Sequence, residues 1–520
     1  MNVCRSAIVA IIMFVSTVVL VGQTEKEYHL QDSRVHHIEQ SSSDIPMHAN
    51  RVSRAQVDSI APDQTGMGNL TSVELAKKMV PGWNVGNSLD AIGGETAWGN
   101  PKITQQLIDS VKSAGFKSIR IPVAWSRFTV DSTFTIDTTW LSRVEEVVNY
   151  VLNDSLYAII NEHWDGGWQQ PTYAQQAYVN NRLAAMWKQI AVHFRDYNDH
   201  LLFAGTNEVM VTNNYNAPTV EYYTVQNSFN QTFVTTVRST GGRNHYRYLL
   251  VQGFNTNIDY TVNYFATPID VTTGRLMVEV HYYDPYDFTL NSNSNITQWG
   301  KDATDPSKTE TWANESYADG QFQKMKVNFI DKGYAVILGE YGVIARLNLG
   351  STALNKEYEG YRRYYMLYVT GSMFKLGLVP MYWDNGGTGN FSMGIFDRST
   401  GSQAYPDIIK AITDAVDTNN VGVHVGELLA PPTTIFLTQN FPNPFNPRTT
   451  IVYSLPVACT VSLRVFDVIG RLITTLVNNR RQDAGNYEVP FEAANLASGV
   501  YFYDLQTAEY RTTKAMILIK

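Results

Sequence analysis

The sequence predicts an α/β fold in which a (β/α)8 TIM barrel, residues 66–418, precedes a small all-β sandwich of Ig-like type, residues 434–520. Three observations predict this arrangement. Eight short apolar runs alternate with longer amphipathic stretches, the pattern of successive strand and helix units around a parallel sheet. Polar residues follow the ends of these runs, as they do at the active-site face of a barrel. The last segment is instead a string of short alternating strands separated by turn residues.

The eight apolar runs are rich in Val, Ile, Tyr and Phe, which favour strands. The predicted strands are 82–86, 118–125, 156–163, 201–208, 247–254, 276–283, 335–341 and 377–383. Most of the stretches between them have apolar residues at helical spacing. The predicted helices are 104–114, 140–153, 176–196, 219–239, 357–375 and 404–416.

Segments without apolar periodicity separate these parts. Residues 23–65 are rich in Ser, Gln, Asp and His and are expected to be a flexible linker, and residues 419–433 a second linker. In residues 1–22 an apolar run follows Arg5, which predicts a signal peptide that is too short for a comfortable membrane span. We therefore expect a bacterial protein that is secreted or held at the cell surface, with no membrane span in the mature chain.

Composition excludes one class of partner. The net charge is -8, with Lys+Arg 40 against Asp+Glu 48, so the chain has no excess of basic residues to neutralise a phosphate backbone, and nucleic acid is not an expected partner. Aromatic residues make up 12% of the chain. That share suits stacking on sugar rings but is equally what a large core would contain.

Chemistry-bearing residues recur at the ends of the predicted strands, and a barrel brings such strand ends to one rim. A single polar residue at the rim of a barrel is usually just hydrogen-bonded within the protein, whereas a full set of such residues at one rim indicates a functional site. Asn84 follows Trp83 in the first predicted strand and Arg120 interrupts the second, and the other candidates end later strands: His163, Asn207, Glu208, His281, Tyr283, Glu340 and Trp383.

Glu208 and Glu340 are the two candidates able to react. The sequence contains no GxSxG elbow, HExxH motif or nucleotide loop, so no metal or other cofactor is expected. A pair of carboxyl groups is the equipment for glycosidic hydrolysis, in which one protonates the leaving oxygen and the other attacks the anomeric carbon. Asn207 can hold a sugar 2-hydroxyl, Arg120 can orient the ionised carboxylate, and an exposed tryptophan such as Trp168 can stack on a pyranose ring.

The motifs also resemble a known family. WNVGNSLDA, ETAWGNP, IRIPVAW, HWDGGW, FAGTNE, HYYDPYDF, ILGEYG and YWDNG occur in order and are similar to those of glycoside hydrolase family five, most of all its subfamily four of endo-β-1,4-glucanases and xyloglucanases. The resemblance covers about residues 66–418. It implies a retaining mechanism with Glu208 as acid/base and Glu340 as nucleophile, and the other strand-end candidates as supporting residues of the active site.

Two positions depart from the pattern of that family. The chain has Val209 where the family usually has proline, and Trp164 where it usually has a second histidine. The first loosens a backbone constraint beside the acid/base, and the second adds an aromatic ring to a binding subsite. Neither removes a reacting group.

The C-terminal segment carries a second resemblance. QNFPNPFNPRTTIVYSLP, VSLRVFDVIGRLITTLV, AGNYEVPFEAANLASGVYFYDLQT and TTKAMILIK are similar to the sorting domain of type IX secretion, which implies the type IX machinery as a partner. A structural spacer and a carbohydrate-binding module are the alternatives. Residues 434–520 contain no tryptophan, which disfavours the module.

The leading hypothesis is thus a secreted retaining endo-β-1,4-glucanase, a cellulase acting on cellulose, mixed-linkage glucan or xyloglucan. A mannanase or xylanase of the same fold and a catalytically inert glycan-binding protein of the cell surface are the alternatives. The sequence does not rank the three glucans, because loops such as 284–318, with Trp299 and Trp312, set the shape of the cleft.

Overall fold

The computed structural model describes residues 59–163, 166–417, 435–437, 440 and 443–520. The predicted signal peptide and the predicted second linker lie outside the described residues, as does Trp164.

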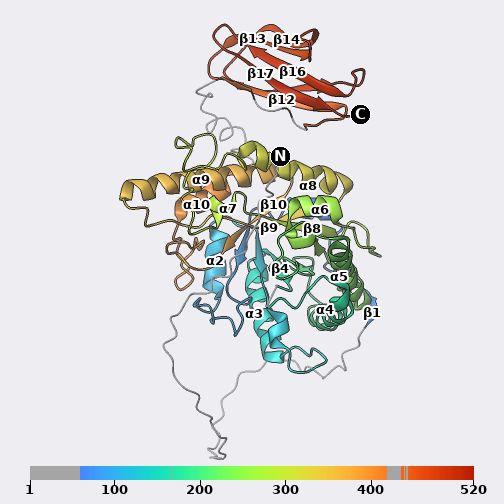
Figure 1. Cartoon of the computed structure of the whole chain (residues 1–520). Helices are drawn as coiled ribbons and strands as arrows, with labels where there is room; N and C mark the ends of the chain where they lie inside the picture. Colours follow the sequence, from blue (N-terminus) through green and yellow to red (C-terminus); the bar gives the residue numbers. More distant parts are fainter. Residues whose placement is uncertain (1–58, 164–165, 418–434, 438–439, 441–442) are drawn as a thin grey trace, which may run out of the picture.

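Eight parallel strands close into a barrel in the order β10-β2-β3-β4-β5-β7-β8-β9, which confirms the predicted fold (Figure 1). The strands are β2 (Gly82–Val85), β3 (Ser118–Ile121), β4 (Tyr157–Asn161), β5 (Leu201–Ala204), β7 (Leu249–Gln252), β8 (Leu276–Tyr282), β9 (Ala335–Tyr341) and β10 (Val379–Asp384). Every predicted strand is present. Most of the predicted runs end later than the observed strands. The residues of the candidate site follow the strands directly, so the sequence pattern does not show where strand pairing stops.

Helices surround the strands in Figure 1. The six predicted ones are α2 (Gln105–Ser113), α3 (Thr138–Asn153), α4 (Tyr173–His193), α5 (Val220–Ser239), α9 (Thr352–Lys375) and α10 (Pro406–Asp414). Four were not predicted, namely α1 (Ser72–Ala76), α6 (Ile258–Tyr264), α7 (Tyr286–Thr289) and α8 (Glu315–Asn328). None of the helices in the described part of the chain is long and apolar enough to cross a membrane.

The two ends of the barrel interior differ in chemistry. Apolar side chains from alternate strand positions, among them Ile159, Leu202 and Met381, fill the end at which the strands begin. Helix α1 belongs to the same cluster through Leu75 and Ala76 and closes that end. Burying these side chains stabilises the barrel by about 1.5–3 kcal/mol for each large apolar residue. Polar residues are therefore left for the other end, where the strands finish.

A short parallel pair lies outside the barrel. Strand β1 (Ile60–Pro62) pairs with β6 (Gly241–Gly242), which follows α5. Gly241 has a positive φ of 67°, and a Cβ atom there would lie 1.7 Å from the carbonyl oxygen of Ile60, so only glycine permits this pairing. Residues 60–62 therefore contact the barrel domain although the sequence analysis expected them in the first linker.

The C-terminal region consists of two antiparallel sheets, which confirms the predicted all-β domain. Strands β11 (Phe436–Leu437), β12 (Arg448–Leu455) and β15 (Gly485–Glu492) form one sheet in the order β11-β12-β15. Strands β13 (Cys459–Asp467), β14 (Leu472–Gln482), β16 (Gly499–Gln506) and β17 (Arg511–Leu518) form the other in the order β14-β13-β16-β17. Ile451 and Tyr453 of the first sheet share one core with Val465 and Tyr503 of the second, which makes the domain a sandwich.

Candidate active site

Arg120 of β3 lies at the centre of the polar end of the barrel. Its side chain is fully buried and lies among groups from four other strands or strand ends. One terminal nitrogen donates to Asn84 Oδ1 at 3.0 Å and to Glu340 Oε1 at 2.9 Å. The other donates to Asn207 Oδ1 at 2.5 Å. A planar guanidinium that holds three partners at once fixes Glu340 and Asn207 relative to each other.

Asn84 of β2 supports this centre from beneath. It is fully buried, and its amide nitrogen donates to the carbonyl of Gly339 at 2.8 Å and to those of Met381 and Tyr382 at 3.2 Å. With its oxygen bonded to Arg120, every polar atom of Asn84 already has a protein partner. Both polar side-chain atoms of Asn84 are thus used within the protein, and its predicted part in substrate binding stays a prediction.

The two candidate carboxyl groups, Glu208 after β5 and Glu340 of β9, approach each other closely. One carboxylate oxygen of each and one ring nitrogen of His281 all lie within 4.8 Å of one another. Retaining glycosidases hold their two carboxyl groups about 5–5.5 Å apart, and inverting ones about 6.5–9.5 Å. His281 Nδ1 lies 2.6 Å from Glu208 Oε1, and the Tyr283 hydroxyl donates to Glu340 Oε2 at 3.2 Å.

Burial and nearby charges set the protonation of this group. Burial raises the pKa of Glu340 above its usual value, and the positive charges of His281 and Arg120 oppose the rise. Burial alone would lower the pKa of His281, but the charge of Glu340, the hydrogen bond to Glu208 and the nearby carboxylate of Glu279 raise it to about 9. His281 is therefore an imidazolium near neutral pH and donates its Nδ1 proton toward Glu208.

An aromatic wall stands beside the carboxyl groups. The Trp383 indole of β10 and the His163 ring after β4 are nearly parallel, with centroids 5.9 Å apart. His163 lies 3.5 Å from Asn207 Nδ2 and 3.2 Å from Asn161 Nδ2. Burial, together with the charges of Arg120 and His281, lowers the pKa of His163 well below its usual value, so this ring is neutral.

Comparison with known proteins identifies the family of the barrel domain. Residues 84–389, more than half of the chain, match the cellulase family, glycosyl hydrolase family 5. The chain belongs to glycosyl hydrolase family 5. It is therefore a glycoside hydrolase, and residues 439–520 match the secretion system C-terminal sorting domain.

Relatives of this family 5 enzyme include endoglucanases. It is 41% identical over 367 residues to endoglucanase A of Paenibacillus barcinonensis, covering 66% of this chain and 90% of the relative. It is 44% identical over 370 residues to a xyloglucan-specific endo-beta-1,4-glucanase of Bacteroides ovatus, covering 68% and 72%. A solved Bacteroides ovatus GH5 xyloglucanase in complex with a XXXG heptasaccharide aligns with a TM-score of 0.66 and 42% identity over 69% of this chain and 79% of that chain. A GH5-4 broad specificity endoglucanase from Clostridium acetobutylicum aligns with a TM-score of 0.60 and 35% identity over 66% and 100%.

Two further tryptophans of the family 5 enzyme differ in their surroundings. Trp168 is half-buried, and the Arg182 guanidinium of α4 stacks 4.5 Å over its indole, so its part in substrate binding stays a prediction. Trp299 is only 2% exposed, donates to the carbonyl of Ala313 at 2.8 Å and packs edge-on against Tyr365. Trp299 therefore anchors its loop from within and does not face the cleft.

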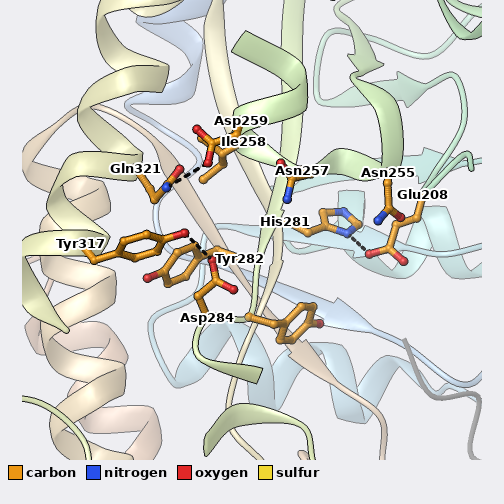
Figure 2. Close-up of a pocket in the computed structure, with 11 residues that line it drawn as sticks. Glu208, Asn255, Asn257, Ile258, Asp259, His281, Tyr282, Asp284, Tyr317 and Gln321 are labelled. Atoms are coloured by element: carbon orange, nitrogen blue, oxygen red, sulfur yellow. Dashed lines mark hydrogen bonds and ion pairs between the residues drawn. The ribbon is translucent and has the colours of Figure 1, made fainter. Parts of the chain in front are cut away.

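A small cavity adjoins Glu208 and His281 on the side of α6 and α8 (Figure 2). Its volume is about 30 Å³, which admits about two water molecules and no sugar ring. The Tyr317 hydroxyl donates to Asp284 at 3.3 Å in its wall, and burial raises the pKa of Asp284 to about 6. The cavity thus adjoins the acid/base candidate and is by itself too small for a sugar ring.

The trio of Glu208, His281 and Glu340 has donor types that could also bind a metal ion. A histidine ligand must offer an unprotonated nitrogen. Because the pKa of His281 is raised to about 9, both of its nitrogens carry protons near neutral pH. A metal ion at this trio would therefore have to displace a proton from His281.

Two residues of the site escaped the sequence analysis. Glu279 of β8 and Gln252 of β7 are fully buried beneath the carboxyl groups and hydrogen-bond to each other. Both lie inside apolar runs, whose pattern predicts a strand and does not mark these two residues as part of a site. The available signal was the spacing of Glu279 and His281, since residues two apart in a strand point to the same face.

Proposed function

We propose that this family 5 enzyme is an exported retaining endo-β-1,4-glucanase, with Glu340 as the nucleophile and Glu208 as the acid/base. The observation that carries this proposal is the approach of the two carboxyl groups, within 4.8 Å by their oxygens, with Arg120 on one and His281 on the other. Members of the family are retaining, and this close approach agrees with the short separation of the two carboxyl groups in retaining enzymes.

In the first step Glu340 attacks the anomeric carbon as the bond to the leaving oxygen breaks. Arg120 and Tyr283 hold the Glu340 oxygens in place for this attack. Glu208 transfers its proton to the leaving oxygen, so the departing sugar is a neutral alcohol. The product of this step is a covalent glycosyl ester on Glu340.

In the second step water takes the place of the departed sugar. Glu208, now a carboxylate, accepts a proton from that water as its oxygen attacks the anomeric carbon. The ester bond to Glu340 breaks, and the released sugar has the configuration of the substrate. Each step inverts the anomeric carbon once, so the overall result is retention.

The remaining groups are assigned to holding the sugar. Asn207 Nδ2 lies near His163, and we assign the amide to the 2-hydroxyl of the ring next to the scissile bond. The parallel rings of Trp383 and His163 support an aromatic platform for that sugar. Asn84 and Arg120, both fully buried, act from behind by fixing Glu340 and Asn207.

The proposed substrates are β-1,4-linked glucans. The support comes from the relatives, some described as xyloglucan-specific and others as broad-specificity endoglucanases. We include cellulose, mixed-linkage glucan and xyloglucan, because the backbone linkage is common to all three.

The C-terminal sandwich is proposed to direct the enzyme through type IX secretion to the cell surface or the medium. Its match to a secretion sorting domain supports this role. Deleting residues 434–520 should leave catalysis intact and hold the enzyme in the periplasm of a type IX host. Release of the deleted form into the medium, or binding of the isolated sandwich to polysaccharide, would contradict the assignment.

One experiment tests the catalytic proposal. Purified enzyme is given cellulose, mixed-linkage glucan, xyloglucan, xylan and mannan, and reducing ends and viscosity are followed together. We expect a rapid fall in viscosity with the glucans and, by proton NMR on a soluble oligosaccharide, a β-anomer as the first product. A first product with the α-configuration, or activity confined to xylan or mannan, would refute it.

A further inference from the structure

A third glutamate, Glu279, lies beneath the two reacting carboxyl groups. Its side chain is fully buried on β8, and its Oε1 lies 2.8 Å from Nε of Arg120, an ion pair without the alignment of a hydrogen bond. The same oxygen lies 3.5 Å from His281 Nε2. Glu279 thus faces the two cations that hold Glu340 and Glu208, from the side opposite to the reaction.

The other oxygen of Glu279 is tied to the strand that ends in the acid/base. Gln252 Nε2 donates to Glu279 Oε2 at 2.7 Å. Gln252 Oε1 in turn accepts from the backbone nitrogen of Thr206 at 3.1 Å and from its hydroxyl at 3.0 Å. Thr206 directly precedes Asn207 and Glu208, so this buried chain links Glu279 to the strand end that carries the acid/base.

The residue before the nucleophile makes room for this glutamate. A Cβ atom at Gly339 would lie 2.1 Å from Glu279 Oε1. Since the backbone of Gly339 leads directly to Glu340, the carboxylate of Glu279 and the nucleophile's strand are packed without free space. Any shift of Glu279 is therefore transmitted to Glu340.

We infer that Glu279 is a positioning residue of the reaction: its buried carboxylate balances the charge of Arg120 and His281 and, through Gln252 and Thr206, fixes the acid/base relative to the nucleophile. This inference rests on the proposed roles of Glu208 and Glu340. Glu279 itself has no contact with the position of the substrate, because Arg120 and His281 lie between.

The charges around the site agree with this role. Burial opposes ionisation of Glu279, but Arg120, His281 and Gln252 outweigh it and lower its pKa below the usual value. The ionisable groups that interact with His281 are Glu208 of the β5 end, Glu279 of its own strand, Glu340 of β9 and His163 of the β4 end. The first three raise the pKa of His281, so losing one of them lowers it.

Two variants separate the charge of Glu279 from its hydrogen bonds. Glu279→Gln removes the charge and turns an amide NH2 toward either Arg120 Nε or Gln252 Nε2, both donors, which destabilises the core. The double variant Gln252→Glu with Glu279→Gln exchanges the two groups. In this double variant the glutamate at residue 252 accepts hydrogen bonds from Thr206 and from the side-chain amide at residue 279, and the oxygen of that amide faces Arg120. The hydrogen bonds and the total charge are therefore kept, while the negative charge moves from β8 to β7.

We expect Glu279→Gln to lower the midpoint of thermal unfolding and the exchange variant to restore most of it. In both, kcat/KM on a soluble xyloglucan or glucan oligosaccharide should fall about 10- to 100-fold. The basic limb of the pH profile should move to lower pH by about half a unit or more, because His281 has lost one of the three anions that raise its pKa. A role in packing alone would not move that limb in a variant of restored stability.

If the exchange variant has the kcat/KM and the pH profile of the wild type, the inference is overturned. It is also overturned if neither variant folds, because Glu279 then has a role in core stability alone. Glu208→Gln and Glu340→Gln are measured in parallel. If these two variants keep full activity, the proposed function fails; if they are inactive while the Glu279 variants behave as wild type, only the present inference fails.

Discussion

Gly86 leaves the space that the indole of Trp383 occupies: a Cβ atom at residue 86 would lie 2.6 Å from Cζ2 and Cη2 of that ring. Gly86 directly follows β2, and Trp383 belongs to β10, the strand paired with it. Trp383 stacks in parallel with His163. The absence of a side chain at residue 86 therefore sets the position of the aromatic wall beside the carboxyl groups.

Gly86→Ala should push the Trp383 ring away from His163 and weaken sugar binding. We expect kcat/KM to fall about 10-fold or more, mostly through KM, because the reacting groups themselves stay in place. Initial rates on a glucan oligosaccharide measure it. Gly360→Ala on α9 is the matched control, since a Cβ atom there has nothing within 4 Å. Unchanged KM in Gly86→Ala would show that Trp383 does not contact the substrate.

Small anions should distinguish the two glutamates. Glu340→Ala should lose activity by about 10⁴-fold or more. Azide should restore turnover by attacking from the α face in the space of the lost carboxylate, so NMR should show an α-glycosyl azide. Glu208→Ala should keep a fast first step with dinitrophenyl glycosides, whose leaving group needs no proton, and azide should then give a β-glycosyl azide. The same azide anomer from both variants would contradict the assigned roles.

Stability should fall as pH rises through the titration of His281. The pKa of His281 is about 9 in the folded protein and about 6.5 in an unfolded chain. Between these values the folded state binds more protons, so this contribution is complete below about pH 6.5 and is lost as pH rises through about 9. The slope reaches about 1.4 kcal/mol per pH unit. Urea unfolding at pH 6, 7, 8 and 9 of the wild type and of His281→Gln measures it, and equal pH dependence in the two would contradict it.

The barrel domain should fold without the sandwich. A protein of residues 59–417 keeps β1 and its pairing with β6, whereas one of residues 66–418, the boundary predicted from sequence, lacks them. We expect both to be active and to unfold cooperatively, with a higher midpoint of thermal unfolding for the longer form. Calorimetry and a reducing-sugar assay compare them. Inactivity of both forms, reversed when residues 434–520 are restored, would refute separate folding.

The positions of the eight strands followed from the sequence because a parallel strand buried on both faces is a run of apolar residues. Their ends did not follow. The run 201–208 continues to Glu208, yet β5 ends at Ala204. The site residues at strand ends stood out as polar groups after apolar ones. Glu279 did not, since its role depends on Arg120 and Gln252 from distant strands. The polar sequence of α8, with Gly320 inside it, carries too little apolar periodicity to predict a helix.

The strands that close the barrel, β2 and β10, come from opposite ends of the domain sequence. The Trp83 indole donates to Asp384 across this seam, and Arg398, later still, binds Asp384 and the carbonyl of Gly86. During synthesis some 300 residues must therefore be added after β2 before its partner strand β10 exists. A nascent or prematurely terminated chain that stops before β10 presents two open sheet edges, on β2 and β9, and such edges pair with other chains. Because β10 is the last barrel strand to be synthesised, this protein is most prone to aggregation before β10 has been made.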